Sequence, residues 1–401
     1  MRVFYICQRV PYPPDRGDKI TTFNEIRHLS KNHEVHVFCL GDGEQDLANT
    51  VKLKEYNVAS VTAVPFTGIG TKYRALLALF FGGALSVAAF NKKKLHDAIK
   101  LRFAESKPDV MIVYSCNVAQ YAAHFAEVPR IMQFADLDSL KFGQYAERSG
   151  FILRWVYKLE QQRLLAYERH IADTFTHSLV CTDVERRDFE RLIPGRPVTL
   201  VANGVDLEFF HPLGLEKKPG SIVFTGVMDY LPNIDAVQWF CSEIFPLVKQ
   251  QVPDASFVIC GSRPVPAVLQ LTQIPGVAVT GRVPDTRPYM DEAQVFVAPL
   301  RMARGIQNKV LEALAMGLPC VSSTAAWSGT VIPSGDGIVA ADEPSEFANR
   351  VIRLLADRDY REQMASKARQ SAETYYTWEA QMQRLDQVIE AVVHPHGKPN
   401  Q

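Results

Sequence analysis

The feature that most restricts the fold of this chain is a regular alternation of short apolar runs with longer stretches of helical character. In the first half, the apolar runs read "RVFYICQ", "EVHVFCL", "DVMIVYS", "RIMQFAD" and "HSLVCT". A second series begins with "SIVFTG" at 221–226 and continues with "ASFVICG", "VAVTG", "VFVAPL", "PCVSS" and "GIVAA". Such alternation is typical of parallel sheets whose strands are joined by helical crossovers. The sequence therefore predicts an α/β fold with two doubly wound parallel-sheet domains.

The expected helices and domain borders follow from the same pattern. We expect helices at about 21–31, 151–173, 234–250, 344–356, 359–375 and 377–393. The stretch 203–220 holds turn residues, a proline and lysines between two strand-rich blocks, which is typical of a linker. The expected domains are 1–205 and 206–376, with a closing helix at 377–393 that packs back on the first domain and a tail at 394–401. Doubly wound sheets bind ligands at the carboxyl ends of their strands, so a cleft between the domains is the expected active site.

Charge and cysteine content argue against several classes of function. Lysine plus arginine equals aspartate plus glutamate, at 44 each, so no strongly basic surface for nucleic acid is expected. The seven cysteines are scattered singly without a CxxC pair, which favours buried reduced thiols in a cytoplasmic protein over disulfides or a metal site. The N-terminus lacks the apolar core and the cleavage site of a signal peptide.

The longest apolar run, "ALLALFFGGALSVAAF" at 75–90, leaves two interpretations open. It has sixteen residues and paired glycines, which is short of the roughly 20 residues that a membrane-spanning helix needs. One interpretation is a buried helix or helix pair. The other is a peripheral contact with the cytoplasmic face of a membrane, because Arg74 and the lysines at 92–94 flank the run and suit an anionic surface.

The stretch "ARGIQNKVLEALAMGLPCV", 303–321, contains several residues suited to holding an anion. A helix is expected from about Asn308 to Gly317, and a helix N-terminus presents unpaired amides that attract phosphate. Gly305 allows close approach of a ligand to the backbone, and Asn308 is the expected N-cap. Lys309 and Glu312 are three residues apart and share one face of the helix. The alternative is a surface ion pair between them with no further function.

Two motifs resemble those of the family-4 glycosyltransferases of the GT-B fold. "GIQNKVLEALAMGLPCV" is similar to the glutamate-containing signature of that family, and "LVANGVDLEFFHP", 200–212, is similar to its interdomain segment. The strand–helix rhythm and the closing helix with Trp378 agree with this resemblance. It implies two facing Rossmann-like domains and a nucleotide-diphosphate sugar as donor substrate, held mainly by the C-terminal domain. It also implies retention of anomeric configuration without a bound metal or other cofactor.

The sequence departs from the family pattern at the positions expected to bind the donor. Family members commonly have a second glutamate eight residues before the one that matches Glu312, and this position is Arg304 here. By resemblance, the missing glutamate would contact the donor sugar, whereas Glu312 keeps the role of binding the ribose hydroxyls. The family also often has an arginine and a lysine after the first strand of the second domain. Here that stretch reads "FTGVMDYLPNID", which contains the donor-binding candidate Gly226 and has neither cation.

These departures lead to a hypothesis about the leaving group. A diphosphate leaves readily only if its growing charge meets preorganised positive groups. We expect Arg304 and Lys309 to replace the missing cations, since arginine can bind phosphate oxygens bidentately and lysine acts as a point charge. Arg282, at a predicted strand end, is a further donor-binding candidate, with Arg301 and Arg263 in reserve. The alternative for each of these three is an ordinary solvated surface arginine.

The first domain offers candidates for acceptor chemistry. Gly17, in "RVPYPPDRGDKITTF", matches the glycine-rich loop that the family places beside the donor phosphate, although a plain proline-rich turn is the alternative. "RIMQFADLDSLKF", 130–142, lacks the histidine that related enzymes often hold there and has Asp136 and Asp138 instead. Either carboxylate could orient or deprotonate an acceptor hydroxyl, and the alternative is an Asx turn or helix cap formed by Asp138 and Ser139. "FADLDS" together with "RGIQNKVLEA" is most similar to a subgroup linked to bacterial exopolysaccharide and exosortase (PEP-CTERM) systems.

The sequence therefore predicts a cytoplasmic hexosyltransferase that moves a sugar from a nucleotide-diphosphate donor to a hydroxyl acceptor. The expected acceptor is a glycan or a lipid-linked glycan, with a possible contact to the inner-membrane surface. Two alternatives stay open at this point. One is a GT-B-fold nucleotide-sugar epimerase, and the other is a non-catalytic homologue that only binds a nucleotide sugar.

Overall fold

The computed structural model describes residues 1–66, 82–147 and 149–395, and these residues form two compact units. The first unit comprises Met1–Ala202 and the chain from Gln381 onward, and the second comprises Asn203–Ala380. The chain thus enters the second unit at the start of the predicted linker and leaves it within its last helix. Residues 75–81 of the apolar run and residues 396–401 of the predicted tail lie outside the described residues.

In unit 1, the described residues form a seven-stranded, all-parallel sheet with the order β3-β2-β1-β4-β5-β6-β7. The chain moves outward from β1 to β3 and then crosses back to β4 on the other side of β1. This reversal is the mark of a doubly wound sheet and confirms the predicted fold class for this unit. The strands are β1 (Arg2–Cys7), β2 (Glu34–Gly41), β3 (Ser60–Pro65), β4 (Val110–Tyr114), β5 (Arg130–Ala135), β6 (His177–Val180) and β7 (Val198–Leu200).

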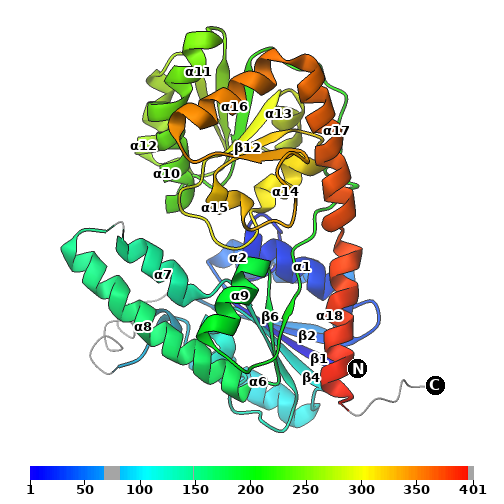
Figure 1. Cartoon of the computed structure of the whole chain (residues 1–401). Helices are drawn as coiled ribbons and strands as arrows, with labels where there is room; N and C mark the ends of the chain where they lie inside the picture. Colours follow the sequence, from blue (N-terminus) through cyan, green and yellow to red (C-terminus); the bar gives the residue numbers. More distant parts are fainter. Residues whose placement is uncertain (67–81, 148, 396–401) are drawn as a thin grey trace. The chain divides into compact units, whose positions relative to one another are not determined.

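Helices cover both faces of this sheet, and α7 and α8 form a hairpin that reaches beyond it (Figure 1). The α8 helix, expected at about 151–173, extends over Phe151–Thr174. The described helices of the unit are α1 (Gly17–Leu29), α2 (Glu44–Ala48), α3 (Thr50–Leu53), η1 (Lys54–Tyr56), α5 (Leu85–Ala89), α6 (Lys93–Glu105), η2 (Cys116–Tyr121), α7 (Asp138–Glu147), α8 and α9 (Asp183–Leu192).

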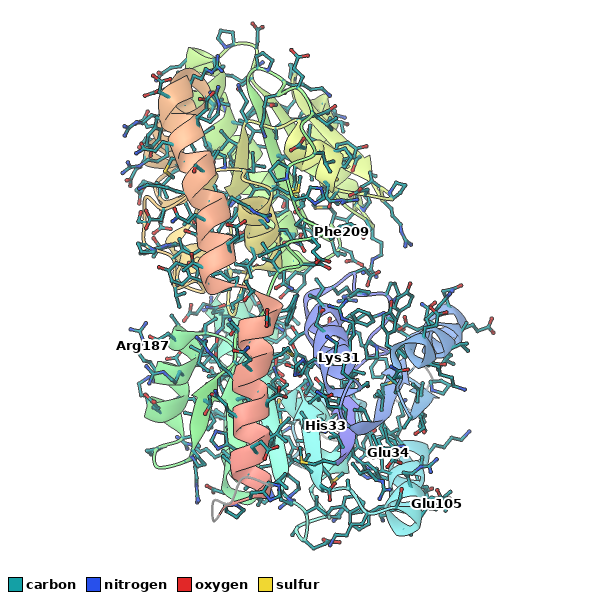
Figure 2. The ribbon with its side chains drawn as sticks, turned by 90° about the vertical axis from the view of Figure 1, so that its right-hand side faces the viewer. Lys31, His33, Glu34, Glu105, Arg187 and Phe209 are labelled. Carbon is teal, nitrogen blue, oxygen red and sulfur yellow. The ribbon has the colours of Figure 1, made fainter. Side chains whose placement is uncertain are left out.

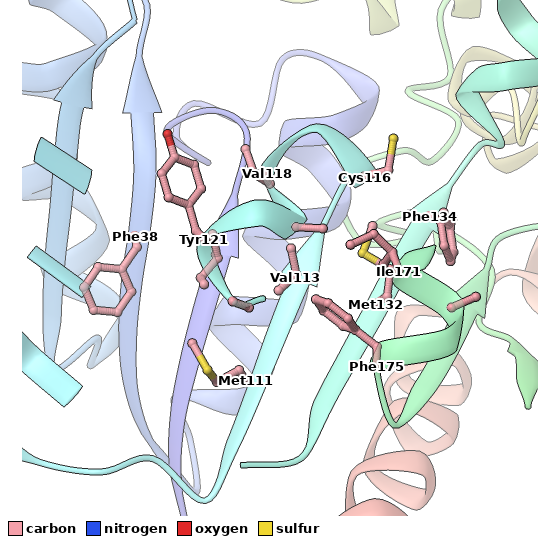
Figure 3. Close-up of a cluster of buried hydrophobic side chains, with 14 of the residues drawn as sticks. Phe38, Met111, Val113, Cys116, Val118, Tyr121, Met132, Phe134, Ile171 and Phe175 are labelled. Atoms are coloured by element: carbon pink, nitrogen blue, oxygen red, sulfur yellow. The ribbon is translucent and has the colours of Figure 1, made fainter. Parts of the chain in front are cut away.

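An apolar core of unit 1 lies on one face of the sheet, where alternate residues of the strands meet α6, η2 and α8 (Figure 3). Successive side chains of a strand point to opposite faces, so Met111 and Val113 of β4 belong to this core. Tyr121 and Ile171 enter it from η2 and α8 and are fully buried. Parallel strands covered on both faces read as continuous apolar runs, which explains why the sequence identifies them so clearly.

The opposite face carries α1 and a buried polar link between strands. Glu25 of α1 accepts a hydrogen bond from the Tyr5 hydroxyl on β1 (2.6 Å) and another from the Gln133 amide on β5 (2.8 Å). Burial raises the pKa of Glu25 to about 7. The closing helix α18 (Trp378–Val393) also contacts this unit, since His28 of α1 lies 2.8 Å from Asp386. Figure 2 shows α18 beside the turn that carries Lys31 and His33.

Unit 2 repeats this architecture with a six-stranded parallel sheet among its described residues, in the order β10-β9-β8-β11-β12-β13. Its strands are β8 (Ser221–Thr225), β9 (Ser256–Cys260), β10 (Val277–Gly281), β11 (Val295–Ala298), β12 (Cys320–Ser322) and β13 (Ile338–Ala340). Its described helices are α10 (Leu231–Trp239), the π-helical turn η3 (Phe240–Ile244), α11 (Phe245–Gln251), α12 (Pro266–Leu269), η4 (Gln270–Gln273), α13 (Arg287–Asp291), α14 (Asn308–Ala315), α15 (Thr324–Trp327), α16 (Pro344–Ala356), α17 (Arg358–Tyr375) and the start of α18.

The predicted helix at 234–250 differs from the structure, because α10 and α11 are separated by the π-helical turn. Pro246 lies at the start of α11 and has no N–H to donate to the preceding turn, which accounts for the break. The helices at 344–356 and 359–375 occur as α16 and α17. All seven cysteines are free and buried, as their apolar contexts predict. Within the described ranges, no helix is both long and apolar enough to cross a membrane.

The close approach of β8 and β9 at their carboxyl ends depends on Gly261. A Cβ atom at this position would lie 1.6 Å from the Gly226 carbonyl oxygen, so no side chain fits unless the backbone moves. We expect Gly261→Ala to destabilise the protein by about 2 kcal/mol or more, because overpacking against backbone cannot be relieved by a rotamer change. Urea unfolding measures this change.

Gly150→Ala is the matched control, because a Cβ at Gly150 meets no atom within 4 Å. Equal free energies of unfolding for the Gly261→Ala variant and the wild-type protein would contradict the close contact between Gly261 and the Gly226 carbonyl oxygen.

Candidate functional site

The strand order of unit 2 places its ligand site next to β8. The chain leaves β8 toward β9 on one side and returns to β11 on the other, so β8 and β11 flank the switch point. These two strands pair only at Ile222–Val295 and Val223–Phe296 and then part. Thr225, at the end of β8, is buried there with its hydroxyl unpartnered among the described residues. Ligands of doubly wound sheets bind in the crevice that such a separation creates.

Lys309 projects its amino group to the end of β8. It is the second residue of α14, and its Nζ donates a hydrogen bond to Asn233 Oδ1 (2.5 Å) on α10. The same nitrogen lies 4.5 Å from the ring centroid of Phe224, the fourth residue of β8. A Cβ added at Gly226 would lie only 3.1 Å from this Nζ, so Gly226 and Lys309 are direct neighbours.

The surroundings of Lys309 disfavour its charge. Burial lowers the pKa of Lys309 to about 7, and the attraction of Glu312 only partly opposes this effect. A bound anion would restore the charge by supplying the missing counter-charge. Strongly perturbed pKa values in a ligand crevice are typical of functional groups.

Asn233 holds Lys309 in place and was not identified by the sequence analysis. It is buried, and its Nδ2 donates to the Val227 carbonyl (2.9 Å) while its Oδ1 accepts from Lys309. The amide therefore ties the loop after β8 to the start of α14. The only signal in the sequence is its place in "DYLPNID", which would not distinguish it from an ordinary helix residue.

Glu312 lies one turn further along α14 and is half-buried. No hydrogen bond or ion pair joins its carboxylate to any other residue in the part of the chain that the structure describes. Burial raises its pKa to about 7, against the opposing attraction of Lys309. Lys309 and Glu312 do not form the surface ion pair that was the alternative, because the Lys309 amine donates its hydrogen bond to Asn233. Glu312 is thus a carboxylate with free acceptor positions.

The loop before α14 brings Arg304 and Gly305 to the same end of the sheet. Gly305 has a φ of +65°, a conformation that favours glycine, and a Cβ at Gly329 would lie 2.2 Å from its carbonyl oxygen. The Arg304 carbonyl accepts a hydrogen bond from the Gln307 side chain (3.0 Å), and its side chain is half-buried. The backbone at Gly305 is therefore packed closely against the backbone at Gly329.

The prediction of Asn308 as N-cap is wrong. Gln307 occupies that position and makes no capping bond with its side chain, so Asn308 is the first helical residue. The Asn308 side chain instead accepts a hydrogen bond from Asn203 Nδ2 (2.9 Å). An N-cap must have extended backbone, which Gln307 has, with φ −88° and ψ 95°. The first amides of α14 are consequently left without a side-chain cap and can meet an anion.

The other candidate arginines of unit 2 differ in their surroundings. Arg282 directly follows β10, is exposed, and stands two strands away from β8, at roughly 10 Å by strand spacing. Arg301 forms an ion pair with Asp235 and lies over the ring of Trp239. Arg263 is paired with Asp229 (3.3 Å). The structure thus brings Gly226, Gly305, Asn308, Lys309 and Glu312 together around α14, with Arg304 in the preceding loop, and leaves Arg282 at the edge.

In unit 1, buried carboxylates fix the loop that carries Asp136 and Asp138. Glu185 accepts from the Leu137 amide (3.1 Å), and Glu168 accepts from the Ser139 amide (3.0 Å) and the Ser139 hydroxyl (2.5 Å). Asp138 is therefore not a simple cap for its own helix. It accepts hydrogen bonds from Cys116 Sγ (3.3 Å) and Asn117 Nδ2 (3.2 Å), two residues of η2.

Backbone strain marks the same end of the sheet. Ala135, the last residue of β5, has a φ of +61°, and Ser115, directly after β4, has a φ of +82°. Non-glycine residues in this region cost about 1–3 kcal/mol and cluster at functional sites. Asp136 follows Ala135 and is half-buried. The side chain of Asn117 is buried with its Oδ1 unpartnered among the described residues, so it joins the candidates that the sequence analysis missed.

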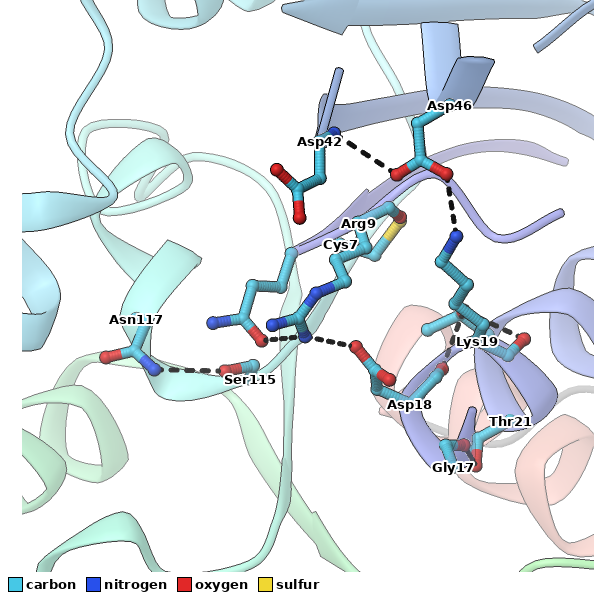
Figure 4. Close-up of polar contacts among 12 residues, drawn as sticks. Cys7, Arg9, Gly17, Asp18, Lys19, Thr21, Asp42, Asp46, Ser115 and Asn117 are labelled. Atoms are coloured by element: carbon cyan, nitrogen blue, oxygen red, sulfur yellow. Dashed lines mark hydrogen bonds and ion pairs between the residues drawn. The ribbon is translucent and has the colours of Figure 1, made fainter. Parts of the chain in front are cut away.

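Gly17 begins α1, after the loop that follows β1, and its carbonyl accepts from the Thr21 hydroxyl (3.1 Å). Two nearby cations, Arg9 and Lys19, are paired within the unit, as Figure 4 shows. Arg9 contacts Asp18 (2.5 Å), and Lys19 is buried against Asp46 (2.8 Å). Lys19 is thus a structural cation. Gly17, expected in a loop before a helix at about 21–31, is instead the first residue of α1.

The raised pKa of Glu168 predicts that the stability of the protein depends on pH. Burial raises its pKa to about 8, so the folded protein binds a proton that the unfolded chain releases at much lower pH. Its stabilising contribution is fully present below the unfolded pKa of about 4.3 and is lost as the pH rises through about 8. We expect Glu168→Gln to reduce this loss by up to about 1.4 kcal/mol per pH unit in that window. Unfolding curves between about pH 5 and pH 8 measure the effect.

Glu105→Gln, at an exposed position on α6, is the matched control and should keep the wild-type pH profile. An unchanged profile in Glu168→Gln would mean that Glu168 is ionised throughout this window.

Comparisons with known proteins agree with this arrangement. The family described as Glycosyl transferases group 1 matches residues 219–357, which contain β8 to β13 and α14. No protein among those curated for function matches the chain. Among solved structures, the sucrose-phosphate synthase of Thermosynechococcus elongatus is similar, with a TM-score of 0.72 and 16% identity over 98% of this chain and 100% of that chain.

Two further structures are similar over nearly the full length. HepE from Anabaena, solved with UDP-glucose, has a TM-score of 0.69 and 13% identity over 98% of this chain and 100% of that chain. TarM has a TM-score of 0.70 and 10% identity over 97% of this chain and 98% of that chain. The TM-scores establish a shared fold. Residues 219–357 are thus similar to the group 1 glycosyltransferase domain, and the chain as a whole has the GT-B fold.

Proposed function

We propose that this protein is a glycosyltransferase that moves a sugar from a nucleotide-diphosphate donor to a hydroxyl acceptor with retention of configuration. The observation that carries the proposal is the Lys309 amino group, held by Asn233 beside Gly226 at the switch point of unit 2. This point lies within the matched glycosyltransferase domain. HepE was solved with UDP and with UDP-glucose, which supports testing uridine donors first.

In this proposal, the donor diphosphate lies at the N-terminus of α14. Uncapped amides and the helix dipole attract the phosphates, and Lys309 supplies a full charge. Gly226 and Gly305 leave room for the phosphates next to the backbone. Glu312, with free acceptor positions, binds the ribose hydroxyls.

Catalysis would depend on charge that develops during the reaction. As the glycosidic bond to the diphosphate breaks, negative charge grows on the leaving oxygen and is stabilised by groups already in position. We assign this role to Arg304 and Lys309, with Arg282 available to the donor from the edge strand. Front-side attack, in which the leaving phosphate helps to deprotonate the acceptor, would retain the anomeric configuration without a protein nucleophile.

The acceptor is assigned to unit 1, where Asp136 and Asp138 follow β5 on a loop held by Glu168 and Glu185. A carboxylate there can orient or deprotonate a hydroxyl. A glycan or lipid-linked glycan of exopolysaccharide or glycoconjugate biosynthesis, met at the cytoplasmic membrane surface, is the acceptor class that we propose.

Arg304→Ala tests the proposed leaving-group role. We expect turnover to fall about 10²–10³-fold with a much smaller change in donor KM, because the arginine acts mainly on charge that appears in the transition state. Release of nucleoside diphosphate from a panel of UDP- and GDP-sugars gives the readout, with and without glycan acceptors.

Arg350→Ala, on the surface of α16, is the matched control for the loss of an arginine. Unchanged turnover in Arg304→Ala would contradict the assignment. Donor binding without release of diphosphate by the wild-type protein would favour a non-catalytic binding protein, and isomerisation of the free nucleotide sugar would favour an epimerase.

The lowered pKa of Lys309 predicts that the protein takes up a proton when it binds the donor. Its pKa is lowered to about 7 in the free protein, so above pH 7 much of the population has a neutral amine, which the bound diphosphate would recharge. Affinity for UDP-sugar should then fall by up to about tenfold per unit between about pH 7 and pH 8.5. Calorimetry in buffers of different ionisation enthalpy measures the proton uptake.

Lys309→Arg is the control, since arginine stays charged throughout this range and its variant should take up fewer protons on binding the donor than the wild-type protein. If the wild-type protein binds donor with no uptake and no pH dependence, Lys309 does not contact the diphosphate.

A further inference from the structure

The free end of the α7–α8 hairpin exposes a group of large apolar side chains. Phe151, Ile152, Leu153 and Trp155 retain 88%, 77%, 53% and 59% of their accessible surface. They occupy the first five residues of α8, so they surround the tip of the helix. Single exposed apolar residues are ordinary, whereas a contiguous exposed group of this size marks an interaction surface. We call these four residues the apolar tip.

The hairpin below the apolar tip is firmly packed. Phe142 and Tyr145 of α7 meet Tyr157 of α8, with ring centroids 5.8–5.9 Å apart. Further along α8, Glu160 and Leu164 are buried. The apolar tip is therefore presented by a supported helix, and among the described residues its four side chains remain exposed.

A second apolar segment is attached to the same helix. Glu160 accepts hydrogen bonds from the amides of Leu85 (2.7 Å) and Ser86 (2.9 Å), and Arg163 donates to the Gly83 carbonyl (3.1 Å). The described end of the apolar run at 82–90 is thus fixed to α8 about 14 Å from Phe151, at 1.5 Å per residue. Two apolar stretches that are distant in sequence lie on one hairpin.

Basic residues predominate around the apolar tip. Arg154 and Lys158 are exposed between and after its apolar residues, and the sequence from 148 to 158, "RSGFILRWVYK", contains three basic residues and no acidic one. Glu147, exposed at the end of α7, is the nearest preceding acidic residue in the sequence. Apolar and aromatic side chains next to lysine and arginine match the interface of an anionic bilayer, where apolar groups enter and cations contact headgroups.

We propose that the apolar tip inserts into the surface of an anionic lipid bilayer, with Arg154 and Lys158 contacting the lipid headgroups. A convex helix end fits a lipid surface, which moulds around it, better than it fits the flat self-complementary face of a second copy. The inference does not rest on the proposed function. If both hold, the bilayer contact would bring unit 1 to a membrane-embedded acceptor.

Vesicle flotation of the full-length protein tests this inference. We expect the protein to float with vesicles of phosphatidylglycerol and phosphatidylcholine and to bind pure phosphatidylcholine much more weakly. Ile152→Glu combined with Trp155→Glu should reduce binding at least about tenfold, because charged side chains oppose insertion. Both positions are exposed, so the melting temperature should not change, and this measurement checks folding.

Leu101→Glu is the matched control, because Leu101 is 64% exposed on α6 of the same unit but lies outside the apolar tip. It should leave vesicle binding unchanged. Arg154→Gln and Lys158→Gln should each lower binding to the anionic vesicles by about fivefold, the effect expected for one charge near an anionic surface.

Fluorescence gives a second readout that locates the contact. The emission of Trp155 should shift to the blue when anionic vesicles are added, and Trp155→Phe should lose this shift but keep flotation. The proposal is overturned if the wild-type protein fails to float with anionic vesicles or if the double glutamate variant floats equally well. Loss of a concentration-dependent dimer in that variant, without any vesicle binding, would assign the apolar tip to a second copy of the chain.

Discussion

The candidate donor site depends on one interaction, the hydrogen bond that fixes the Lys309 amine to Asn233 beside Gly226. Lys309 belongs to α14 and Asn233 to α10, and Gly226 directly follows β8. The bond therefore lies where three segments meet, at the point where the sheet reverses its strand order. The position lowers the lysine pKa to about 7 and thereby prepares it for an anionic partner. An amine left in water would gain far less from meeting a phosphate, because solvent already stabilises its charge.

In unit 1, buried carboxylates hold the loop after β5 in place. The loop after β5 leaves the sheet through the left-handed residue Ala135, and its strain is supported by hydrogen bonds to Glu168 and Glu185. Cys181 Sγ adds a further bond to the Ala135 carbonyl (2.9 Å). Asp138 is thereby fixed at the carboxyl edge of the sheet. The cost is a buried carboxylate, Glu168, whose pKa is raised to about 8.

Much of the fold could be predicted from the sequence, because parallel strands covered on both faces are continuous apolar runs. The α14 signature also predicted Lys309 and Glu312 as site residues, and the structure places the Lys309 amine beside Gly226 and Asn233. Contacts between distant segments could not be predicted in this way. Asn233 lies 76 residues before Lys309, and its role exists only when α10 and α14 are neighbours. The apolar tip was likewise hidden, since "FILRWV" shows helical character but not which of its side chains lack a partner. The N-cap was misplaced by one residue because side-chain preference, rather than backbone conformation, was used to assign it.

The most direct test of the central claim, that Lys309 holds a donor diphosphate, is thermal unfolding with UDP, UMP, GDP and GMP for the wild-type protein and Lys309→Met. A ligand that binds only the folded state raises stability by RT ln(1 + [L]/Kd), or about 2.7 kcal/mol at a hundredfold excess over Kd. The account predicts that the diphosphate of one base stabilises the wild-type protein clearly more than its monophosphate. It further predicts that this difference disappears in Lys309→Met. Equal shifts with the diphosphate and the monophosphate, or a difference that survives in the variant, would contradict it.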